Sequence, residues 1–246
     1  MRIDFSARGS GTPILWFPGL LLLLVLATAP PCSGQTVHDF GSWFSLNTTG
    51  PLNLGKQTGK LRWWFDGHLR YLHDSGGFHQ SIFRPGIGYQ LNPNTSLWAG
   101  YGWINDLPPS GAPIRDENRI WQQLLWTPRW KTVSLMSRSR FEQRFVSTGN
   151  DAGLRFRQFF KADCPFRASS PNSLVIWDEM FIGLNETDWG QKGRFGQNRL
   201  FIGLGHKFNG PHKPKIEIGY LNQFFPRTGV NDRMNHILSF NWFATF

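Results

Sequence analysis

The sequence predicts an all-β fold: a single closed antiparallel transmembrane β-barrel of about ten to twelve strands, preceded by a cleaved N-terminal signal peptide. Three observations predict this fold. A basic N-terminus leads into a short apolar stretch, and the rest of the chain alternates apolar and polar residues in segments of strand length. The last of these segments is aromatic and uncharged.

The composition of the 246-residue chain is typical of a membrane barrel. Charged residues make up 17% of it, below the roughly 25% of soluble domains. The 12 Trp and 22 Phe indicate a protein that places aromatic rings at lipid headgroups. A mean hydropathy of −0.34 excludes a helical membrane protein. The net charge of +10 comes largely from scattered Arg, so we expect no nucleic-acid partner, because such proteins cluster their basic residues.

The N-terminal segment is expected to be an export signal. Two arginines precede an apolar stretch over 14–29, which is shorter than the roughly 20 residues of a membrane-spanning helix. We place the cleavage after Gly34. This divides the chain into a signal peptide, 1–34, and a single barrel domain, 35–246.

Other outcomes remain open for this segment: cleavage after Ala29, lipid attachment at Cys32, or an uncleaved anchor. Pro30 would follow a cleavage at Ala29, and prolines replace the small residues that a lipid-attachment site needs. Cleavage after Gly34 would leave Cys164 as the sole cysteine, so no intramolecular disulfide could form. No Cys/His group has the spacing of a zinc site, and we expect neither a metal nor a cofactor.

After residue 35 the chain breaks into segments of strand length. Gly, Pro, Asn and Asp separate them at 73–77, 92–94, 148–151 and 209–211, which is typical of repeated β-hairpins. The expected strands cover 38–47, 60–72, 79–91, 95–105, 117–127, 132–146, 153–162, 173–185, 197–208, 215–225 and 234–246.

Apolar and charged residues alternate within these segments. In 135–145, Phe141 and Phe145 oppose Arg140 and Arg144. A lipid-facing Arg at mid-depth costs about 2–4 kcal/mol, and several would exceed the stability of a typical fold. The charged face of a barrel must therefore point inward. A secreted soluble β-sandwich could present the same charges to water, and it remains the alternative at this point.

The final segment favours the barrel over the sandwich. Leu238, Phe240, Trp242, Ala244 and Phe246 share one face. As an exposed edge they would promote aggregation of a soluble protein, whereas in a closed barrel they face lipid. A terminal aromatic residue looks like the signal read by the barrel assembly machinery, so Phe246 is the expected assembly signal. We expect a monomer in the bacterial outer membrane, with lipid and this machinery as partners.

Parity constrains the strand number. Bacterial barrels have an even number of strands and are expected to have both chain ends in the periplasm. The odd number of segments therefore predicts that 38–47 is not a full strand or that another strand lies near 51–58. The same rule places the loops 106–116, 186–196 and 226–233 outside the cell.

Short motifs in a fixed order resemble one known family. The motifs are Arg84-Pro85-Gly86-Ile87-Gly88-Tyr89, Leu97-Trp98-Ala99-Gly100-Tyr101, Arg138-Ser139-Arg140-Phe141-Glu142-Gln143-Arg144-Phe145, Gly153-Leu154-Arg155-Phe156-Arg157, Asp178-Glu179-Met180-Phe181, Gln197-Asn198-Arg199 and Gly219-Tyr220-Leu221-Asn222-Gln223. With these motifs the chain is similar to the bacterial domain-of-unknown-function family numbered 2490, whose members are predicted outer-membrane barrels. The resemblance covers nearly the whole mature chain; it implies location and architecture and supplies no activity.

An inward charged face gives the barrel an Arg-rich polar lumen with two open roles. It is structural if Arg and Glu pair and fill a narrow barrel. It serves porin-like passive transport or binding of a small anionic solute if Arg binds phosphate or carboxylate. The candidate residues are Arg62, Asp66, Arg70, Arg84, Arg119, Arg138, Arg140, Glu142, Arg144, Arg155, Arg157, Glu179, Arg199 and Glu217.

A membrane-embedded lipid-modifying enzyme is the remaining alternative. His236, Ser239 and Asn241 lie on the last segment, and these are the residue types of an outer-membrane lipase. Alternation places His236 on the face opposite the other two, so they cannot form a triad. The sequence therefore predicts no catalytic residues and no enzymatic activity.

Overall fold

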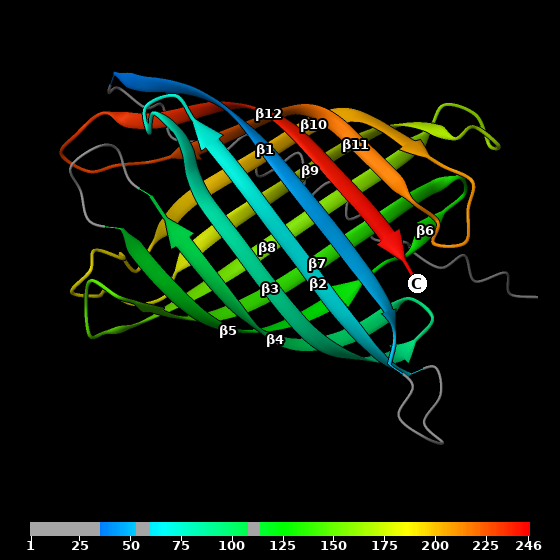
Figure 1. Cartoon of the computed structure of the whole chain (residues 1–246), viewed down its shortest axis with the longest axis horizontal. Helices are drawn as coiled ribbons and strands as arrows, with labels where there is room; N and C mark the ends of the chain where they lie inside the picture. The colour runs from blue at the N-terminus through cyan, green and yellow to red at the C-terminus, as the bar shows by residue number, and fades with distance from the viewer. Residues whose placement is uncertain (1–34, 53–59, 108–113) are drawn as a thin grey trace, which may run out of the picture. The chain divides into compact units, whose positions relative to one another are not determined.

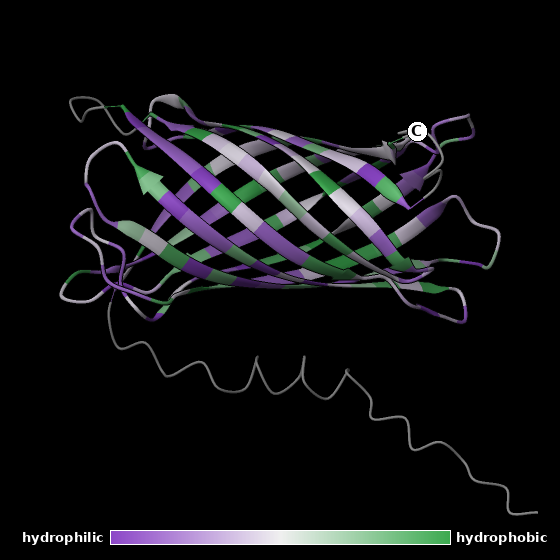
Figure 2. Cartoon of the chain, turned by 90° about the horizontal axis from the view of Figure 1, so that it is seen from below, coloured by the Kyte–Doolittle hydropathy of each residue, from purple (hydrophilic) through white to green (hydrophobic). Residues whose placement is uncertain are grey.

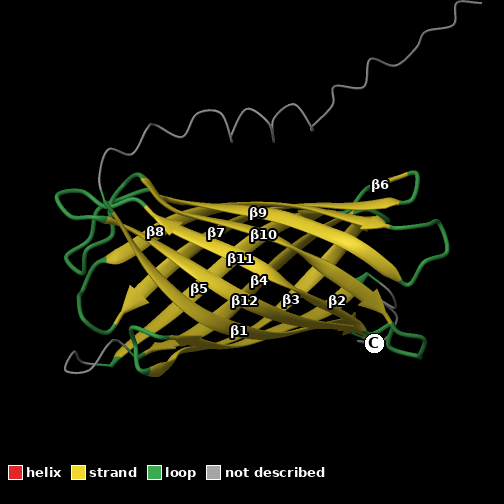
Figure 3. Ribbon diagram, turned by 90° about the horizontal axis from the view of Figure 1, so that it is seen from above, coloured by secondary structure: helices red, strands yellow, loops and turns green. Residues whose placement is uncertain are grey.

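The computed structural model describes residues 35–52, 60–107 and 114–246. These ranges hold β-strands, turns and loops without a helix (Figure 3), and thus no helix long and apolar enough to cross a membrane. The strands are β1 (Thr36–Pro51), β2 (Leu61–Leu72), β3 (Gly77–Asn92), β4 (Thr95–Asp106), β5 (Arg115–Trp126), β6 (Arg129–Trp130), β7 (Val133–Val146), β8 (Ala152–Pro165), β9 (Asn172–Gly183), β10 (Phe195–Lys207), β11 (Lys215–Phe225) and β12 (Asp232–Thr245).

Eleven of these strands close into a barrel (Figure 1). Each long strand pairs with its neighbours in the chain, β5 pairs with β7, and β1 pairs with β12. The short β6 only extends the turn before β7. The sequence prediction of the long strands is confirmed to within a few residues, whereas β6 was not predicted. Closure excludes the two-sheet sandwich.

The seam between the first and last strands corrects the expected topology. β1 and β12 run parallel, in register from Thr36 beside Asp232 to Thr49 beside Thr245. The predictions of an even strand number and a wholly antiparallel barrel are therefore wrong. In an up-and-down barrel with an odd strand count, the first and last strands point the same way, so the seam must be parallel.

The explanation offered for the odd number of segments is not needed either. The segment predicted at 38–47 is a full strand, β1, so no strand is missing from the count. The hidden strand expected near 51–58 falls mostly on 53–59, outside the described residues. Because β1 runs parallel to β12, it begins at the barrel end opposite the C-terminus. The two ends of the barrel domain therefore do not share one side.

The outer wall carries apolar side chains and the inner wall carries polar ones. Hydropathy alternates along the strands in Figure 2, and large side chains such as Phe40, Ile87 and Leu204 are at least 60% exposed. Exposed aromatic residues mark both rims of this wall: Trp126 and Trp242 lie at or near the strand ends on the C-terminal side, and Phe78 and Phe145 lie near the strand ends on the opposite side. The strands of the barrel have 11–16 residues, enough for the 9–11 or so that cross a bilayer.

Glycines on two adjacent strands make room for an inward Trp ring on the next strand. The register aligns Gly86 of β3 with Gly100 of β4, and Gly100 with Trp121 of β5. A Cβ on Gly86 would lie 2.5 Å from the Trp121 ring, which is fully buried. Strand glycines permit such close approach, so Gly86 and Gly100 serve the packing of the Trp121 ring.

Replacing Gly86 with Ala should lower the free energy of unfolding by about 1–3 kcal/mol, the usual effect of overpacking. The measurement is equilibrium urea unfolding in lipid vesicles. Gly196→Ala is the matched control, because a Cβ there would have no neighbour closer than 3.9 Å. A Gly86→Ala variant as stable as Gly196→Ala would contradict this packing argument.

Candidate functional site

Glu142 on β7 is the centre of the charged interior. The carboxylate is fully buried and accepts hydrogen bonds from Arg155 Nε at 2.9 Å and Arg157 Nη1 at 2.6 Å. Arg140, also fully buried, lies over the Trp121 ring and donates to Gln123. A buried carboxylate is stable only when paired in this way. Glu142 therefore neutralises two arginines of the neighbouring strand β8.

Other inward carboxylates repeat this arrangement. Arg157 continues from Glu142 to Glu179 on β9, with its Nη2 at 2.7 Å from Glu179. Glu117 on β5 accepts from Arg119 at 2.6 Å and from Arg144 at 2.5 Å. The result is a band of ion pairs that follows the inner wall from β5 to β9.

The structure brings together most of the predicted ladder. Asp66 pairs with Arg84, Arg138 pairs with Glu179, and Glu217 accepts from Lys161 across the barrel at 2.5 Å. Arg62 faces inward but makes no hydrogen bond or ion pair with the described residues. The buried members, at most 7% exposed, are Asp66, Arg70, Arg84, Arg119, Arg140, Glu142, Arg157, Glu179 and Glu217; Arg138, Arg144, Arg155 and Arg199 are partly buried.

Apolar clusters fill the remaining interior. One cluster contains Val175, Phe201, Leu221 and Ile237, all 0% exposed, together with Trp43. A second cluster on the facing wall contains Trp98, Trp121 and Leu125. Side chains that line a water-filled channel would be wet, whereas these are dry. The barrel is therefore packed at mid-height, as small barrels are.

Above this packed layer a chamber opens at the barrel end opposite the C-terminus. Its volume is about 940 Å³. Among the described residues, twelve Arg and Lys side chains line it, against the two carboxylates Asp106 and Glu117. Six further carboxylates pair with lining cations, which leaves four positive charges in excess. The chamber is thus strongly attractive to anions.

The loop between β9 and β10 is fixed at the mouth of this chamber. Asp188 accepts the backbone N–H groups of Asn150 and Asp151 at 2.8 and 3.2 Å, which hold the pKa of its carboxyl below the ordinary value. Trp189 Nε1 donates to the Asp151 carbonyl at 2.7 Å, and Arg144 lies over the Trp189 ring. These contacts hold the chamber rim to the preceding hairpin.

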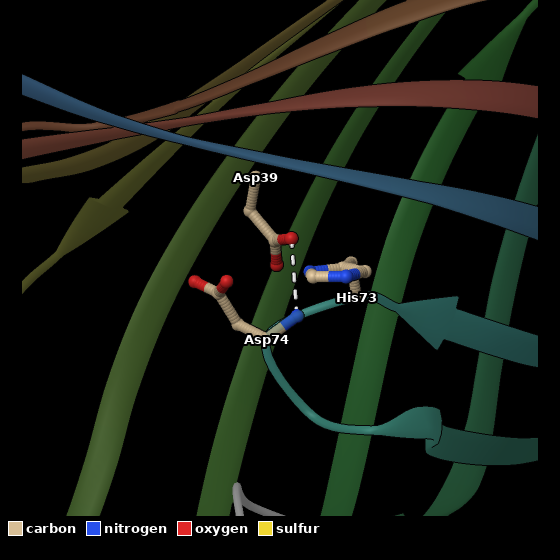
Figure 4. A group of neighbouring side chains, drawn as sticks. All are labelled: Asp39, His73 and Asp74. Carbon is tan, nitrogen blue, oxygen red and sulfur yellow. Dashed lines mark hydrogen bonds between the residues drawn. The ribbon is translucent and has the colours of Figure 1, made fainter.

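A group of potential metal ligands lies near the same end (Figure 4). Asp39 on β1 approaches His73 and Asp74 and accepts the Asp74 backbone N–H at 3.2 Å. The Arg233 guanidinium lies 2.7 Å from Asp39 and 3.3 Å from Asp74. Because the Arg233 guanidinium pairs with both carboxylates, the group is an ion-pair cluster. We assign no metal to it.

Sequence reasoning missed several interior residues. Glu117 lies two positions before Arg119 on the same face, so alternation could have identified it. Trp43 and Phe201 also point inward, and neither was predicted to line the lumen. Their signal is weaker: each shares a face with charged or small residues, and Gly203 lies beside the Phe201 ring. For Phe201, the glycine on the same face is therefore the sequence signal that its ring points inward.

The separation of His236 from Ser239 is confirmed. His236 lies on the outer wall and bonds to Tyr220 Oη and His38, whereas Ser239 is 2% exposed and faces inward with Asn241. The three cannot act together as a nucleophile, base and orienting group. This arrangement gives no basis for a lipase on the last strand.

The fold and its interior define a class: closed β-barrels with a packed, ion-paired lumen and a cationic chamber at one end. The chain belongs to the family described as protein of unknown function (DUF2490), whose model matches residues 40–235. It is 33% identical to an uncharacterized protein of Methylorubrum extorquens over 229 residues, which are 92% of this chain and 96% of the relative. No solved structure matches the chain.

Proposed function

We propose that the protein is an outer-membrane β-barrel that binds small anionic solutes in its end chamber. The observation that carries this proposal is the excess of positive charge in a chamber of about 940 Å³, within the usual size of small-molecule sites. The chamber deepens from exposed rim residues, such as Lys192 and Arg227, to buried floor residues, such as Arg84 and Arg157. An anion would thus leave water gradually as it enters.

Three features support a position in a membrane. The outer wall is apolar, aromatic residues mark both of its rims, and backbone hydrogen bonding closes the sheet without an edge. A closed barrel pairs the backbone N–H and C=O groups of every strand, and unpaired groups at an open edge are too costly in hydrocarbon. The expected export signal and terminal Phe246 favour the outer membrane over other bilayers.

Binding explains the interior better than free passage does. The layer containing Arg140, Glu142 and Phe201 is fully buried, so a solute that enters the chamber meets packed side chains. Passive diffusion would require this layer to move. We therefore assign the excess Arg to binding and the paired Arg to filling the barrel.

Three measurements test the proposal. In cell fractions, the protein should appear in the outer membrane and migrate differently on gels before and after boiling. In planar bilayers, the protein should show little conductance. Calorimetry of the folded protein should detect the binding of an inorganic or organic anion. Recovery from the soluble periplasm would refute the membrane assignment, and stable open channels would refute the closed interior.

Epitope tags in two loops should reveal the orientation. A tag after Thr228, in the loop before β12, should react with antibody on intact cells, because this loop belongs to the end we place outside. A tag after Gly210, between β10 and β11, should react only after lysis. The opposite pattern would place the chamber on the periplasmic side.

Phe246 should direct assembly, as the sequence predicts. Its ring contacts Trp63 and His212, and its backbone N–H donates to Thr49 at 2.9 Å. Phe246→Ala should lower the yield of assembled barrel in cells and leave refolding of the purified protein in detergent nearly unchanged. An equal loss in both settings would indicate a purely structural role.

A further inference from the structure

The floor of the chamber combines two arginines and a tryptophan from three strands. Trp43 of β1 and Arg70 of β2 are directly opposite in the register. The Arg70 guanidinium carbon lies 3.8 Å from the Trp43 ring centroid, and that of Arg199 of β10 lies 4.9 Å from it. Two guanidinium groups therefore share one indole and all three side chains line the chamber.

No carboxylate oxygen of the described residues lies within hydrogen-bond distance of either arginine, in contrast to Arg84, Arg119, Arg144, Arg155 and Arg157 of the ladder. Arg70 donates Nη1 to Gln80 at 2.6 Å, and its Nε has no hydrogen-bond partner among the described residues. The nearest carboxylate oxygen to Arg199, on Glu179, is 3.9 Å away. Glu179 is already held at 2.7 Å by Arg138 and Arg157. Arg70 and Arg199 thus keep uncompensated charge.

The indole N–H adds a second donor without a partner. Trp43 is 6% exposed, and its Nε1 makes no hydrogen bond with the described residues. Arg70 is equally buried, at 6%. Buried donors are almost always satisfied in folded proteins, and an unpaired buried charge is costly. Two unpartnered donors at one place, Arg70 Nε and Trp43 Nε1, indicate a missing acceptor.

We propose that Arg70, Arg199 and Trp43 form a binding site for a phosphate group at the chamber floor. This inference rests on the proposed function, since it names the group that the chamber would bind. A tetrahedral oxyanion offers acceptors in several directions and matches the planar donors of two guanidinium groups. Charge-assisted hydrogen bonds would then replace the missing carboxylate partners.

The test is calorimetric titration of the folded protein in detergent with inorganic phosphate. Arg70→Gln and Arg199→Gln should each weaken binding about tenfold or more, because each removes a charge-assisted hydrogen bond. Arg227→Gln, at the exposed rim of the same chamber, is the matched control and should weaken binding less than about threefold. Trp43→Phe keeps an aromatic ring but removes Nε1, and it should weaken binding measurably. If Arg70→Gln fails the boiling-shift assay for folding, Trp43→Phe and Arg199→Gln together test the site.

The outcomes separate this site from the proposed function. Equal effects of Arg227→Gln and the floor variants would mean diffuse attraction, which refutes the floor site and leaves anion binding intact. Acetate binding without phosphate binding would likewise refute a phosphate site alone. Failure of the wild-type protein to bind phosphate, sulfate or acetate would overturn both.

Discussion

Replacing Glu142 with Gln should lower the free energy of unfolding by about 3–5 kcal/mol, the effect of breaking a buried ion pair from one side. The substitution preserves volume but removes the negative charge that faces Arg155 and Arg157. Arg155 would then remain in the interior without its counter-charge, and Arg157 would keep only Glu179. Urea unfolding in lipid vesicles, followed by tryptophan fluorescence and gel mobility, measures the loss.

The neighbouring outward residue provides the control. Phe141→Leu lies one position away on the opposite face and should cost less than about 1.5 kcal/mol. The double variant Glu142→Gln with Arg155→Gln should lose less than the sum of its single variants, because the second substitution removes an unpaired cation. Additive losses, or a Glu142→Gln variant as stable as Phe141→Leu, would show that the charged layer does not hold the barrel together.

The facing of each strand was predictable because it follows from local sequence alone. Side chains alternate between the two faces of a strand, and a charged side chain is costly in lipid. One charged residue therefore fixes which residues of its strand point inward. Phe141 and Glu142 therefore sort correctly without any knowledge of their neighbours. The positions of the turns were equally local, since Asn92-Pro93-Asn94 and similar groups interrupt the strands by their own backbone preferences.

The partners of the inward residues were not predictable, because register is a property of strand pairs. Lys161 and Glu217 are 56 positions apart and meet inside the barrel although β9 and β10 lie between their strands. Likewise, Trp43 faces Arg70 through the particular register of β1 and β2. The sequence shows that charges point inward, but not which charges remain unpaired, and the chamber floor depends on that difference.

Strand parity was mispredicted because a general rule was given more weight than the residues. The chain contains eleven segments with strand patterning, and the closed sheet uses all eleven. The parallel seam satisfies the backbone of β1 and β12 as fully as an antiparallel one, so closure does not demand an even number. The odd number instead makes β1 and β12 run in the same direction, so the start of β1 and the end of β12 lie at opposite ends of the barrel.

Arginine on the outer wall provides the sharpest test of the surrounding solvent. Ile202 lies near the middle of β10 and is 50% exposed. Ile202→Arg should lower the free energy of unfolding in vesicles by about 2–4 kcal/mol if hydrocarbon covers this position. The same change on a water-covered surface would stay within about 0.5 kcal/mol.

Leu91 separates depth from mere exposure. It is 49% exposed, almost the same as Ile202, but lies near the end of β3, at the rim of the wall. Leu91→Arg should cost only about 0–1 kcal/mol, because an arginine at the interface reaches headgroups and water. The difference between the two variants therefore measures bilayer depth at matched exposure. If both variants are equally mild, water covers the outer wall, and the apolar belt must then be buried by something other than lipid.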